Sequence, residues 1–568
     1  MTKQLLQDNV AVDRRGISID VDQLSRQVRL RNRNQLTLLD AVSFSVSAGE
    51  LVAIVGPSGA GKTTLLETVA GITPATSGSV CFDGVDVYGN LSTFRSVLGY
   101  VPQDDIIHAD LPLERTLRYA ARLRLPSSTT AAEVNGAVRD ALDAVGLRDQ
   151  AEVRVGSLSG GQRKRASIAV ELLTDPHVFF LDEPTSGLDP ITSSELIDRL
   201  RELANRSATV MFTTHSVDDL AACDRVVCVA NGGRLGFVGT VDEALELYGV
   251  GSVHELYRHL TDPDGNHHAA VTAPAAPAPD VRHPSVKRRP VASGLTHWSV
   301  LTRRTLETLV RNRLTLAILV GSPAMVIGMF AILFQPGAFD FENPSPSSMV
   351  MIGFWVVFAA FFFGLTYGLL QICTERAILR REYLVGLRLG AYVASKVTVL
   401  VPFVLLVIVG MLGVLRLLDR LPSRPLSTYA SIAVGLALCS VAALGLGLLT
   451  SASVGNVPQA TLALPMLCFP AVLFSGAILP VHLMPGTGAA LSTVIPTRWA
   501  FEAIGSDLGA RQILAEGGSP LGPPLLESYG DAGTQPIGTN WLILAAFAVV
   551  FLVATWAVLV RTTRKSQR

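Results

Sequence analysis

The sequence predicts an α/β domain in the first half of the chain and an all-helical membrane domain in the second. The apolar run ELVAIVG at 50–56 enters the glycine-rich turn GPSGAGKT, and a helical pattern follows, which together make a strand–loop–helix unit. A second apolar run, VFFL at 178–181, ends in two adjacent carboxylates. Residues 314–560 carry apolar stretches close to the ~20 residues that one helix needs to cross a bilayer.

Composition supports this division and excludes some classes of function. The chain has 568 residues, which is more than one ordinary domain requires, and 49% of them are hydrophobic. The mean hydropathy of +0.40 is high for a purely soluble protein. The formal net charge is zero, so no broad basic surface indicates a nucleic-acid partner.

We divide the chain into four parts. Residues 1–16 form a polar tail with no apolar core, so we expect no cleavable signal peptide. Residues 17–260 alternate apolar and charged stretches, as a soluble α/β domain does. Residues 261–294 are rich in Pro and Ala and are expected to be a flexible linker, in which His267 and His268 are linker residues rather than metal ligands. Residues 295–568 are the expected transmembrane domain.

The cysteines show no spacing suited to a metal or to a disulfide framework, so we interpret them as buried thiols. They are Cys81, Cys223, Cys228, Cys373, Cys439 and Cys468.

The glycine-rich turn at 56–64 predicts a phosphate-binding loop. Its glycines allow backbone N–H groups to close around phosphate oxygens at the positive end of the following helix. Lys62 is expected to reach the β and γ phosphates of ATP, and Thr63 to offer its hydroxyl to Mg²⁺. The expected nucleotide-binding residues of this loop are Gly56, Pro57, Ser58, Gly59, Ala60, Gly61, Lys62, Thr63 and Thr64.

Four further side chains follow apolar runs and are expected at the same site. Asp182, at the end of VFFL, is predicted to hold Mg²⁺, and Glu183 to orient and polarise the attacking water. His215 ends the run ATVMFTTH and is expected to sense the γ-phosphate. Gln103 lies in a loop after an apolar segment and is the third expected Mg²⁺ ligand. The alternatives are two acids on a solvated loop and a purely structural histidine.

These motifs, with LSGGQ at 158–162 and SGLD at 186–189, resemble an ABC ATPase over some 200 residues. The longer string GGQRKRASIAVELLTDPHVFFLDEPTSGLDP resembles the G subfamily of ABC transporters, the White or pigment-precursor type. The resemblance implies an α/β P-loop ABC ATPase domain followed by an all-α, six-span ABC-2 or G-type transmembrane domain. It also implies ATP and Mg²⁺ as cofactors.

The same resemblance implies that two ATPase domains pair head to tail. Ser159, Gly160, Gly161 and Gln162 would then bind the γ-phosphate of ATP held by Lys62 of a second subunit, and Asp189 would communicate across the interface. The chain departs from the family in its adenine contact, because residues 17–39 hold no aromatic side chain. We expect Arg29, Leu30 or Arg31 to cover the base instead.

The membrane half carries six apolar stretches of spanning length. They cover about 314–334, 349–372, 393–415, 429–450, 460–479 and 541–560. Lys and Arg are more frequent at the ends that would be cytoplasmic, which predicts a multi-pass plasma-membrane protein with a cytoplasmic ATPase domain and C-terminus. Between the last two stretches, Pro- and Gly-interrupted apolar residues predict re-entrant or interfacial helices.

Two cytoplasmic segments of this half have their own pattern. Residues 296–313 predict an amphipathic connecting helix along the membrane face. The charged segment CTERAILRREYLVGLRLGAYVASK resembles the subfamily's coupling loop, expected to dock on the ATPase domain near Gln103; a merely solvated charged face is the alternative. The residues that match that pattern are Glu375, Arg376, Glu382, Gly386, Tyr392 and Lys396.

The resemblance implies a half-transporter, working as a dimer with a second copy or a related half-transporter in contact with membrane lipids, that exports a lipid-like or amphipathic compound. The alternative is an ATP-driven regulatory or signalling membrane protein that transports nothing. The expected substrate cavity is lined by Phe358, Phe361, Phe362, Phe363, Thr366, Tyr367, Gln371 and Ser475. The chain is also similar to bacterial transporters that carry FHA domains; with about 20 residues before the ATPase domain, we expect such regulation to be absent or supplied by another chain.

Overall fold

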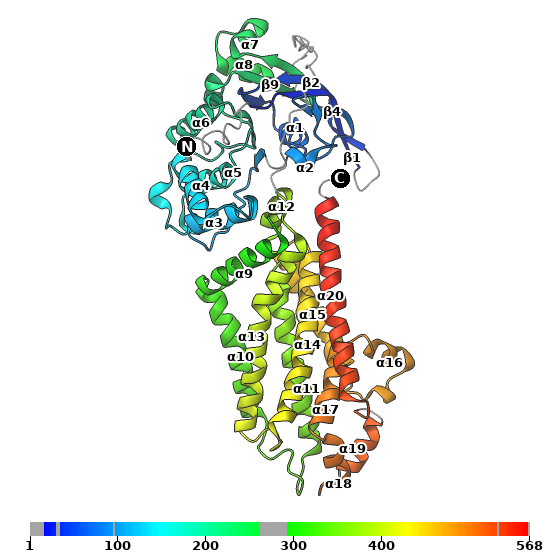
Figure 1. The fold of residues 1–568 in the computed structure, drawn as a ribbon. Coiled ribbons are helices and arrows are strands. Elements are labelled where there is room, and N and C mark those ends of the chain that lie inside the picture. Colours follow the sequence, from blue (N-terminus) through cyan, green and yellow to red (C-terminus); the bar gives the residue numbers. More distant parts are fainter. Residues whose placement is uncertain (1–15, 30–34, 95–96, 262–291, 531–532, 566–568) are drawn as a thin grey trace, which may run out of the picture. The chain divides into compact units, whose positions relative to one another are not determined.

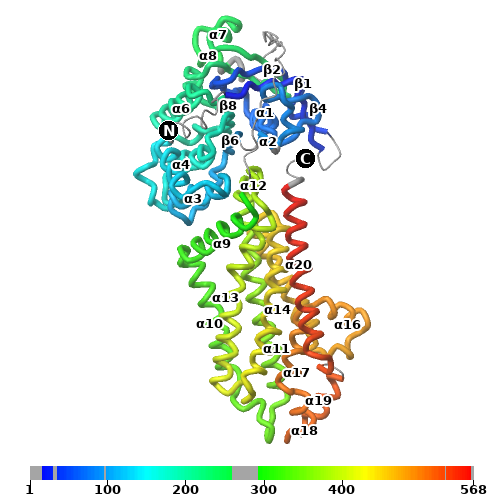
Figure 2. Tube along the Cα trace, in the orientation of Figure 1, coloured from blue at the N-terminus to red at the C-terminus, as the bar shows by residue number. Residues whose placement is uncertain are grey.

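The computed structural model describes residues 16–29, 35–94, 97–261, 292–530 and 533–565 (Figures 1 and 2). The polar tail and most of the predicted linker, with His267 and His268, lie outside these residues. The chain divides into two compact units. Unit 1 is Met1–Thr296 with Arg380–Leu387 and Arg564–Arg568, and unit 2 is His297–Leu379 with Arg388–Thr563.

A six-stranded sheet, in the order β10-β9-β3-β8-β7-β6, organises unit 1. Its strands are β3 (Leu51–Val55), β6 (Leu98–Val101), β7 (Val178–Leu181), β8 (Thr209–Thr213), β9 (Arg225–Ala230) and β10 (Arg234–Gly239). The pairs from β9 through β3, β8 and β7 to β6 are parallel, and β10 is antiparallel at one edge. Parallel pairing brings the carboxyl ends of β3, β7 and β8 to one edge, where α/β sheets bind ligands.

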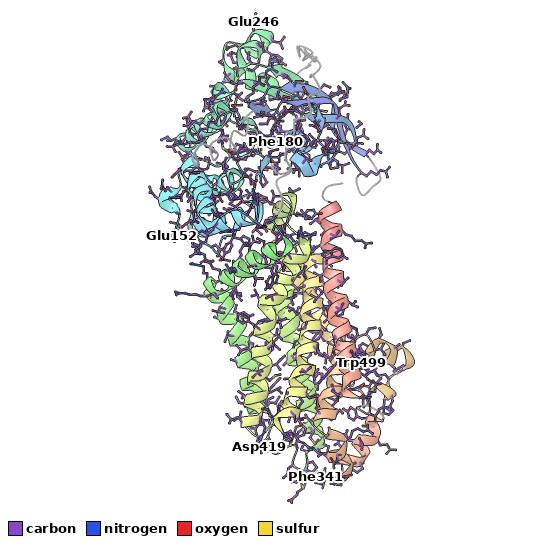
Figure 3. All side chains as sticks on the ribbon, in the orientation of Figure 1. Glu152, Phe180, Glu246, Phe341, Asp419 and Trp499 are labelled. Carbon is purple, nitrogen blue, oxygen red and sulfur yellow. The ribbon has the colours of Figure 1, made fainter. Side chains whose placement is uncertain are left out.

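A smaller antiparallel sheet has the strand order β2-β1-β4-β5. Its strands are β1 (Ile19–Arg29), β2 (Gln35–Val46), β4 (Ser77–Phe82) and β5 (Val85–Asp86). Alternation along β3 explains why unit 1 has two apolar cores: Leu51, Ala53 and Val55 face one core, and Val52 and Ile54 face the other. Phe180 of β7 is fully buried in the second core (Figure 3).

Several helices of unit 1 begin at residues that favour a helix N-terminus. Thr130, Ser159 and Thr240 each form a capping box with the residue three positions on, and Pro190 occupies the first turn of its helix. The helices are α1 (Lys62–Val69), α2 (Leu91–Phe94), α3 (Leu113–Arg124), α4 (Ala131–Ala144), α5 (Gly160–Leu172), α6 (Pro190–Asn205), α7 (Val241–Tyr248) and α8 (Val253–Thr261), with 3₁₀ turns η1 (Arg148–Gln150), η2 (Val155–Ser157) and η3 (Asp218–Ala222). This architecture, followed by an all-helical part, confirms the predicted fold class.

Unit 2 is all-helical in its described residues, and α9, α12 and α20 have residues in both units. The helices are α9 (Gly294–Arg311), α10 (Arg313–Leu333), α11 (Pro346–Leu369), α12 (Arg376–Leu384), α13 (Leu389–Leu417), α14 (Leu426–Ser453), α15 (Val457–Leu473), α16 (Gly486–Ser492), α17 (Pro496–Asp507), α18 (Ala510–Glu516), α19 (Gly522–Tyr529) and α20 (Ile537–Lys565), with the 3₁₀ turn η4 (Val481–Leu483). Helices α10, α11, α13, α14 and α20 are drawn roughly parallel in Figure 1. Contacts join α11 to α14 and to α13, α13 to α14, and α10 to α13.

Small residues allow α11 and α14 to approach closely. A methyl group on Gly364 would lie 2.2 Å from the carbonyl oxygen of Ser440, and one on Gly447 would lie 2.4 Å from that of Leu365. Ser440 adds a hydrogen bond from its hydroxyl to the carbonyl of Ala360 at 2.7 Å. Close backbone contact of this kind is how helices associate in lipid, where the hydrophobic effect gives little help.

The described residues contain five helices long and apolar enough to cross a membrane, namely α10, α11, α13, α14 and the Ile537–Thr563 part of α20. The stretch expected at 460–479 forms instead the shorter helix α15 of 17 residues, which ends at Leu473. The chain between Leu473 and α20 holds η4 and the short helices α16 to α19, where re-entrant or interfacial helices were expected. The connecting helix expected at 296–313 is α9, Gly294–Arg311.

Most of the side chains expected in a substrate cavity pack within unit 2. Phe361, Phe363 and Tyr367 are buried, and the Tyr367 hydroxyl donates to the carbonyl of Leu319 at 2.6 Å. The Thr366 hydroxyl bonds to carbonyls of its own helix, and Ser475 to the carbonyl of Val472. The substrate-cavity assignment therefore remains a prediction.

Candidate nucleotide-binding site

The loop GPSGAGKT connects β3 to α1 in a conformation that needs its glycines. Gly56 has φ 152°, and a methyl group there would lie 2.1 Å from the carbonyl oxygen of Val229. Gly61 has φ 102° and caps the N-terminus of α1, so the first N–H groups of the helix point into the loop. Backbone N–H groups and a helix N-terminus together form a cradle for anionic oxygens.

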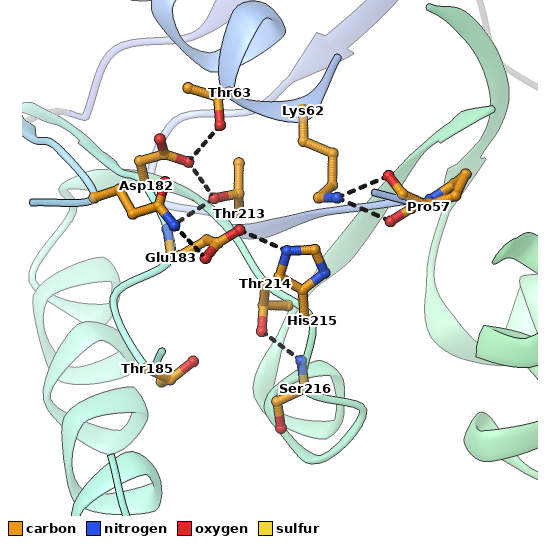
Figure 4. Close-up of polar contacts among 12 residues, drawn as sticks. Pro57, Lys62, Thr63, Asp182, Glu183, Thr185, Thr213, Thr214, His215 and Ser216 are labelled. Carbon is orange, nitrogen blue, oxygen red and sulfur yellow. Dashed lines mark hydrogen bonds and ion pairs between the residues drawn. The ribbon is translucent and has the colours of Figure 1, made fainter. Parts of the chain in front are cut away.

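Lys62 bonds to carbonyls of this same loop. Its Nζ donates to the carbonyls of Gly56 and Pro57, both at 3.0 Å, and the residue is only 6% exposed (Figure 4). Burial lowers the pKa of Lys62, although the nearby Glu183 and Asp182 carboxylates oppose that shift. A buried ammonium that is hydrogen-bonded to neutral carbonyls is well suited to bind a phosphate.

Asp182 stands where β7 ends and faces the loop. Its Oδ1 accepts hydrogen bonds from Thr63 Oγ1 at 3.1 Å and from Thr213 Oγ1 at 2.7 Å (Figure 4). The side chain is almost completely buried, and the two hydroxyls come from α1 and β8. Three different elements thus meet at one carboxylate oxygen.

Glu183 is the next residue, and its carboxylate contacts a different set of side chains from that of Asp182. His215 Nε2 lies 2.5 Å from Glu183 Oε1, and Gln103 Nε2 donates to Glu183 Oε2 at 2.9 Å. The backbone of Glu183 has φ 46°, a left-handed conformation that a non-glycine residue adopts at a cost of about 1–3 kcal/mol. Its N–H is held by Thr213 Oγ1 at 2.8 Å, which stabilises that conformation.

The sequence interpretation missed several residues that support these groups. Thr213 bonds to both Asp182 and Glu183. Its place near the end of the run ATVMFTTH could have indicated this role, since a hydroxyl at the end of a buried strand needs a hydrogen-bond partner. Asp219 accepts from Thr185 at 2.8 Å and from Thr214 at 2.6 Å and so fixes the chain on either side of the site. Lys164 of α5 donates to the backbone carbonyl of Gln103 at 2.6 Å.

The turns at Ser159 and Asp189 form a second, neighbouring surface. Ser159 caps α5, and Asp189 caps α6 by accepting from the N–H and hydroxyl of Thr192 at 3.0 and 2.6 Å. A methyl group on Gly161 would lie 3.0 Å from Leu188 Cδ2, so the two turns touch. The bonds of Ser159, Gln162 and Asp189 are to these helix starts rather than to the loop at Lys62, so the structure brings the predicted residues together in two groups.

Oxygen donors for a magnesium ion are present at the first group. Mg²⁺ prefers hard oxygen ligands and takes few from the protein when phosphates supply the others. The Thr63 hydroxyl and the Asp182 carboxylate meet this requirement. Gln103 directs its amide nitrogen to Glu183, so its role as a ligand remains a prediction. Of the candidates for the adenine contact, Arg29 ends β1, and Leu30 and Arg31 lie outside the described residues.

The segment expected to form a coupling loop contains its own polar contacts. Lys396 Nζ lies 2.8 Å from Glu375 Oε2, and the Tyr392 hydroxyl lies 3.0 Å from the same oxygen. Lys396 and Tyr392 are each 1% exposed. These contacts lie in unit 2 and join the start of α13 to the residue before α12. Gly386 has φ 100°, which fits the turn between α12 and α13.

Comparison with protein families agrees with this geometry. Residues 39–186 match the family model described as ABC transporter, and residues 296–506 match the model described as ABC-2 type transporter. The two matches fall on the α/β part and on the helical part of the chain, respectively.

Individual relatives include bacterial and plant proteins. The chain is 36% identical over 488 residues to the ABC transporter ATP-binding/permease protein Rv1747 of Mycobacterium tuberculosis, covering 82% of this chain and 55% of that protein. It is 31% identical to ABC transporter G family member 8 of Arabidopsis thaliana, over 65% of this chain and 64% of the relative. It is 34% identical to the Nod factor export ATP-binding protein I of Rhizobium meliloti, over 40% of this chain and 70% of the relative. The chain thus spans 55% and 64% of the first two proteins' lengths.

Proposed function

Because this chain belongs to the ABC transporter family, we propose that it is an ATP-hydrolysing exporter, a G-type half-transporter that works as a dimer. Its cargo would be a lipid-like or amphipathic compound moved out of the cytoplasm. The proposal rests on one observation above all: Thr63, Asp182 and Glu183 converge at the carboxyl end of the parallel sheet, with Glu183 held by His215.

We infer a task for each side chain. Lys62 would exchange its carbonyl partners for the β and γ phosphates of ATP. Glu183 would orient the attacking water and accept its proton, and His215 would keep the carboxylate in position and contact the γ-phosphate. A magnesium ion bound by Thr63 and Asp182 would neutralise charge on the phosphates. Positioning and charge neutralisation supply most of the catalysis in phosphoryl transfer.

A dimer would give the second group of residues its ligand. The N-terminus of α5, with exposed Ser159 and Gly160, carries the positive end of the helix dipole, which is suited to a phosphate. In this proposal that phosphate belongs to ATP bound at Lys62 of the second subunit. Asp189, whose turn touches Gly161, would lie at the same interface.

The membrane domain supports the proposal that ATP hydrolysis drives transport. Helices α10, α11, α13, α14 and α20 have spanning length and composition, and we propose that α15 completes a set of six. The ATPase domain would occupy 17–260, the linker 261–294 and the membrane domain 295–568. The excess of Lys and Arg at one set of helix ends favours a plasma membrane in which the ATPase domain and the C-terminus are cytoplasmic. The name of the rhizobial relative, an export protein, supports the outward direction.

Reconstitution into phospholipid vesicles tests the proposal. Phosphate release would be measured for the purified protein and for Glu183→Gln, together with the movement of a fluorescent phosphatidylethanolamine and of an amphipathic dye across the bilayer. We expect ATP-dependent movement of at least one probe by the parent protein and none by the variant. Hydrolysis without movement of either probe would favour a regulatory ATPase. Absence of hydrolysis would contradict the assignment of the site itself.

A further inference from the structure

The short segment Arg380–Leu387 belongs to unit 1 by its contacts, although it lies between two long helices of unit 2 in the sequence. It includes the second half of α12. Two residues after Leu387 the chain enters α13, whose 29 residues reach Leu417.

Arg381 makes the principal contact of the segment. Its Nε donates to Glu171 Oε1 at 2.8 Å, and its Nη2 lies 2.7 Å from the same oxygen. Nη2 also donates to the carbonyl of Ser167 at 2.7 Å, and Nη1 donates to the Ser167 hydroxyl at 3.1 Å and to the carbonyl of Ile106 at 2.8 Å. Its side chain is only 7% exposed. A planar guanidinium is the only side chain with enough directed donors for this set.

The charges around Arg381 are balanced. Glu171 also binds Arg124 of α3 through both oxygens, at 2.7 and 2.8 Å. The buried Glu382 carboxylate favours the charged forms of both arginines. Burial opposes the charged form of Glu171, but Arg124 and Arg381 outweigh it and lower the pKa of Glu171 to about 2. Two arginines and two glutamates thus form a neutral buried cluster, of which the segment supplies one residue of each sign.

Apolar contacts continue the docking beyond the charges. Leu384 and Val385 line a small cavity with Phe94, Leu98 and Tyr100. The cavity also borders Glu171 and Arg381, so the charged cluster and the apolar contact are one continuous surface.

The partners of Arg381 lie on two elements that also carry residues of the candidate nucleotide-binding site. Glu171 and Ser167 lie on α5, the helix that begins at the Ser159 turn. Ile106 lies three residues after Gln103, whose side chain bonds to Glu183. Lys164, one turn before Ser167 on α5, bonds to the backbone of Gln103. One guanidinium therefore ties the C-terminal half of α5 to the loop that holds Gln103.

We propose that Arg381 is a positioning residue for ATP hydrolysis, because it holds α5 and the Gln103 loop in one fixed arrangement. It touches neither ATP nor the reacting atoms. Its loss would leave Lys164 as the remaining contact between α5 and the Gln103 loop, so the Ser159 turn and Gln103 could shift relative to each other while the loop at Lys62 keeps its shape. The inference rests on the proposed ATP hydrolysis and adds a role for one residue, Arg381, that lies outside the nucleotide-binding motifs.

Steady-state kinetics of the full-length protein in phospholipid vesicles test this. We expect Arg381→Met to lower kcat by about 10- to 100-fold and to leave the KM for ATP within about threefold, since small displacements of positioning groups cost rates of this order. Arg381→Lys keeps the buried charge but loses the guanidinium fork, so we expect its kcat to lie between those of the parent and of Arg381→Met. Arg380→Met is the matched control, because Arg380 is the exposed neighbour on α12, and it should retain the parent kcat.

A fluorescent ATP analogue and thermal unfolding, measured on all four proteins, separate positioning from folding. Loss of ATP binding along with turnover in both Arg381 variants would show a merely structural role and overturn the inference. Parent-like kcat in Arg381→Met would overturn it as well, and if that variant does not fold, parent-like kcat in Arg381→Lys would do so. If the parent itself hydrolyses no ATP, the proposed function has failed rather than the role of Arg381.

Discussion

His215 Nε2 and Glu183 Oε1 lie 2.5 Å apart at the ends of two neighbouring parallel strands. The other oxygen of Glu183 accepts from Gln103, so three segments that are far apart in the sequence orient one carboxylate. Glu183 is thereby in position before any nucleotide arrives. Such preorganisation avoids the cost of arranging the base during the reaction.

Glu183→Gln should bind ATP and lose hydrolysis. The amide cannot accept a proton from water, and loss of a general base costs typically about 10²–10⁴-fold in rate. Phosphate release and the binding of a fluorescent ATP analogue measure the two effects, and the closed dimer should accumulate with ATP. Glu195→Gln on the exposed face of α6 is the control and should behave as the parent. Turnover retained by Glu183→Gln would show that another group activates the water.

Thr213→Val should slow hydrolysis by about 10- to 100-fold, because it removes the hydroxyl that bonds to Asp182 and to the N–H of Glu183. It should also lower the free energy of unfolding by about 1–3 kcal/mol. Thr209→Val is the matched control on the same strand, since its buried hydroxyl bonds to Gly49 and Ile17, away from the site. It should lose comparable stability and keep the parent kcat; equal losses of kcat in both variants would contradict the role of Thr213.

A mixture of two inactive variants should regain activity if the site is shared between subunits. Lys62→Ala removes the ammonium that meets the phosphates. Gly160→Asp alters the Ser159 turn at a position where a side chain meets nothing within 4 Å, so the subunit itself should fold. Each variant alone should be inactive, whereas the mixed dimer keeps one intact site. Phosphate release after co-expression measures the recovery. No recovery, although cross-linking shows mixed dimers, would contradict a shared site.

The charged cluster at Glu171 predicts how stability depends on pH. Because the pKa of Glu171 falls from 4.5 to about 2, its carboxylate stabilises the fold fully above pH 4.5 and loses this effect as the pH falls towards 2. Glu171→Gln should therefore destabilise unit 1 by about 3–5 kcal/mol at pH 7, the usual effect of breaking a buried ion pair. Thermal unfolding followed by circular dichroism, at pH 7 and at pH 4, measures the difference between variant and parent.

That difference in unfolding temperature should be constant from pH 7 to about pH 5 and smaller below pH 4.5. Glu202→Gln provides the control, since Glu202 pairs with Arg199 on the exposed surface, where an ion pair contributes little. A difference for Glu171→Gln that grows as the pH falls would show that the carboxylate is not held charged by its arginines.

Local patterns were enough to predict the fold class and the nucleotide loop. Each of these patterns involves residues that are close together in the sequence, so it can be recognised from the sequence alone. They are the glycines of GPSGAGKT, the apolar strand before Asp182, and the capping pair Ser159 and Gln162. Apolar runs near bilayer length are equally local, although α15, which contains Pro465 and Pro470, already ends at Leu473.

The tertiary structure decided what depends on long-range packing. Thr213 became a partner of Asp182 and Glu183 because β7 and β8 pair in parallel and end together. Arg381 is one of several arginines in a charged segment, and only its burial against Glu171, 210 residues away in the sequence, distinguishes it from exposed Arg380. The sequence by itself determined which residues carry ATP chemistry and which segments are apolar. The fold decided which buried charges meet, because a buried charge must find its partner through space rather than along the chain.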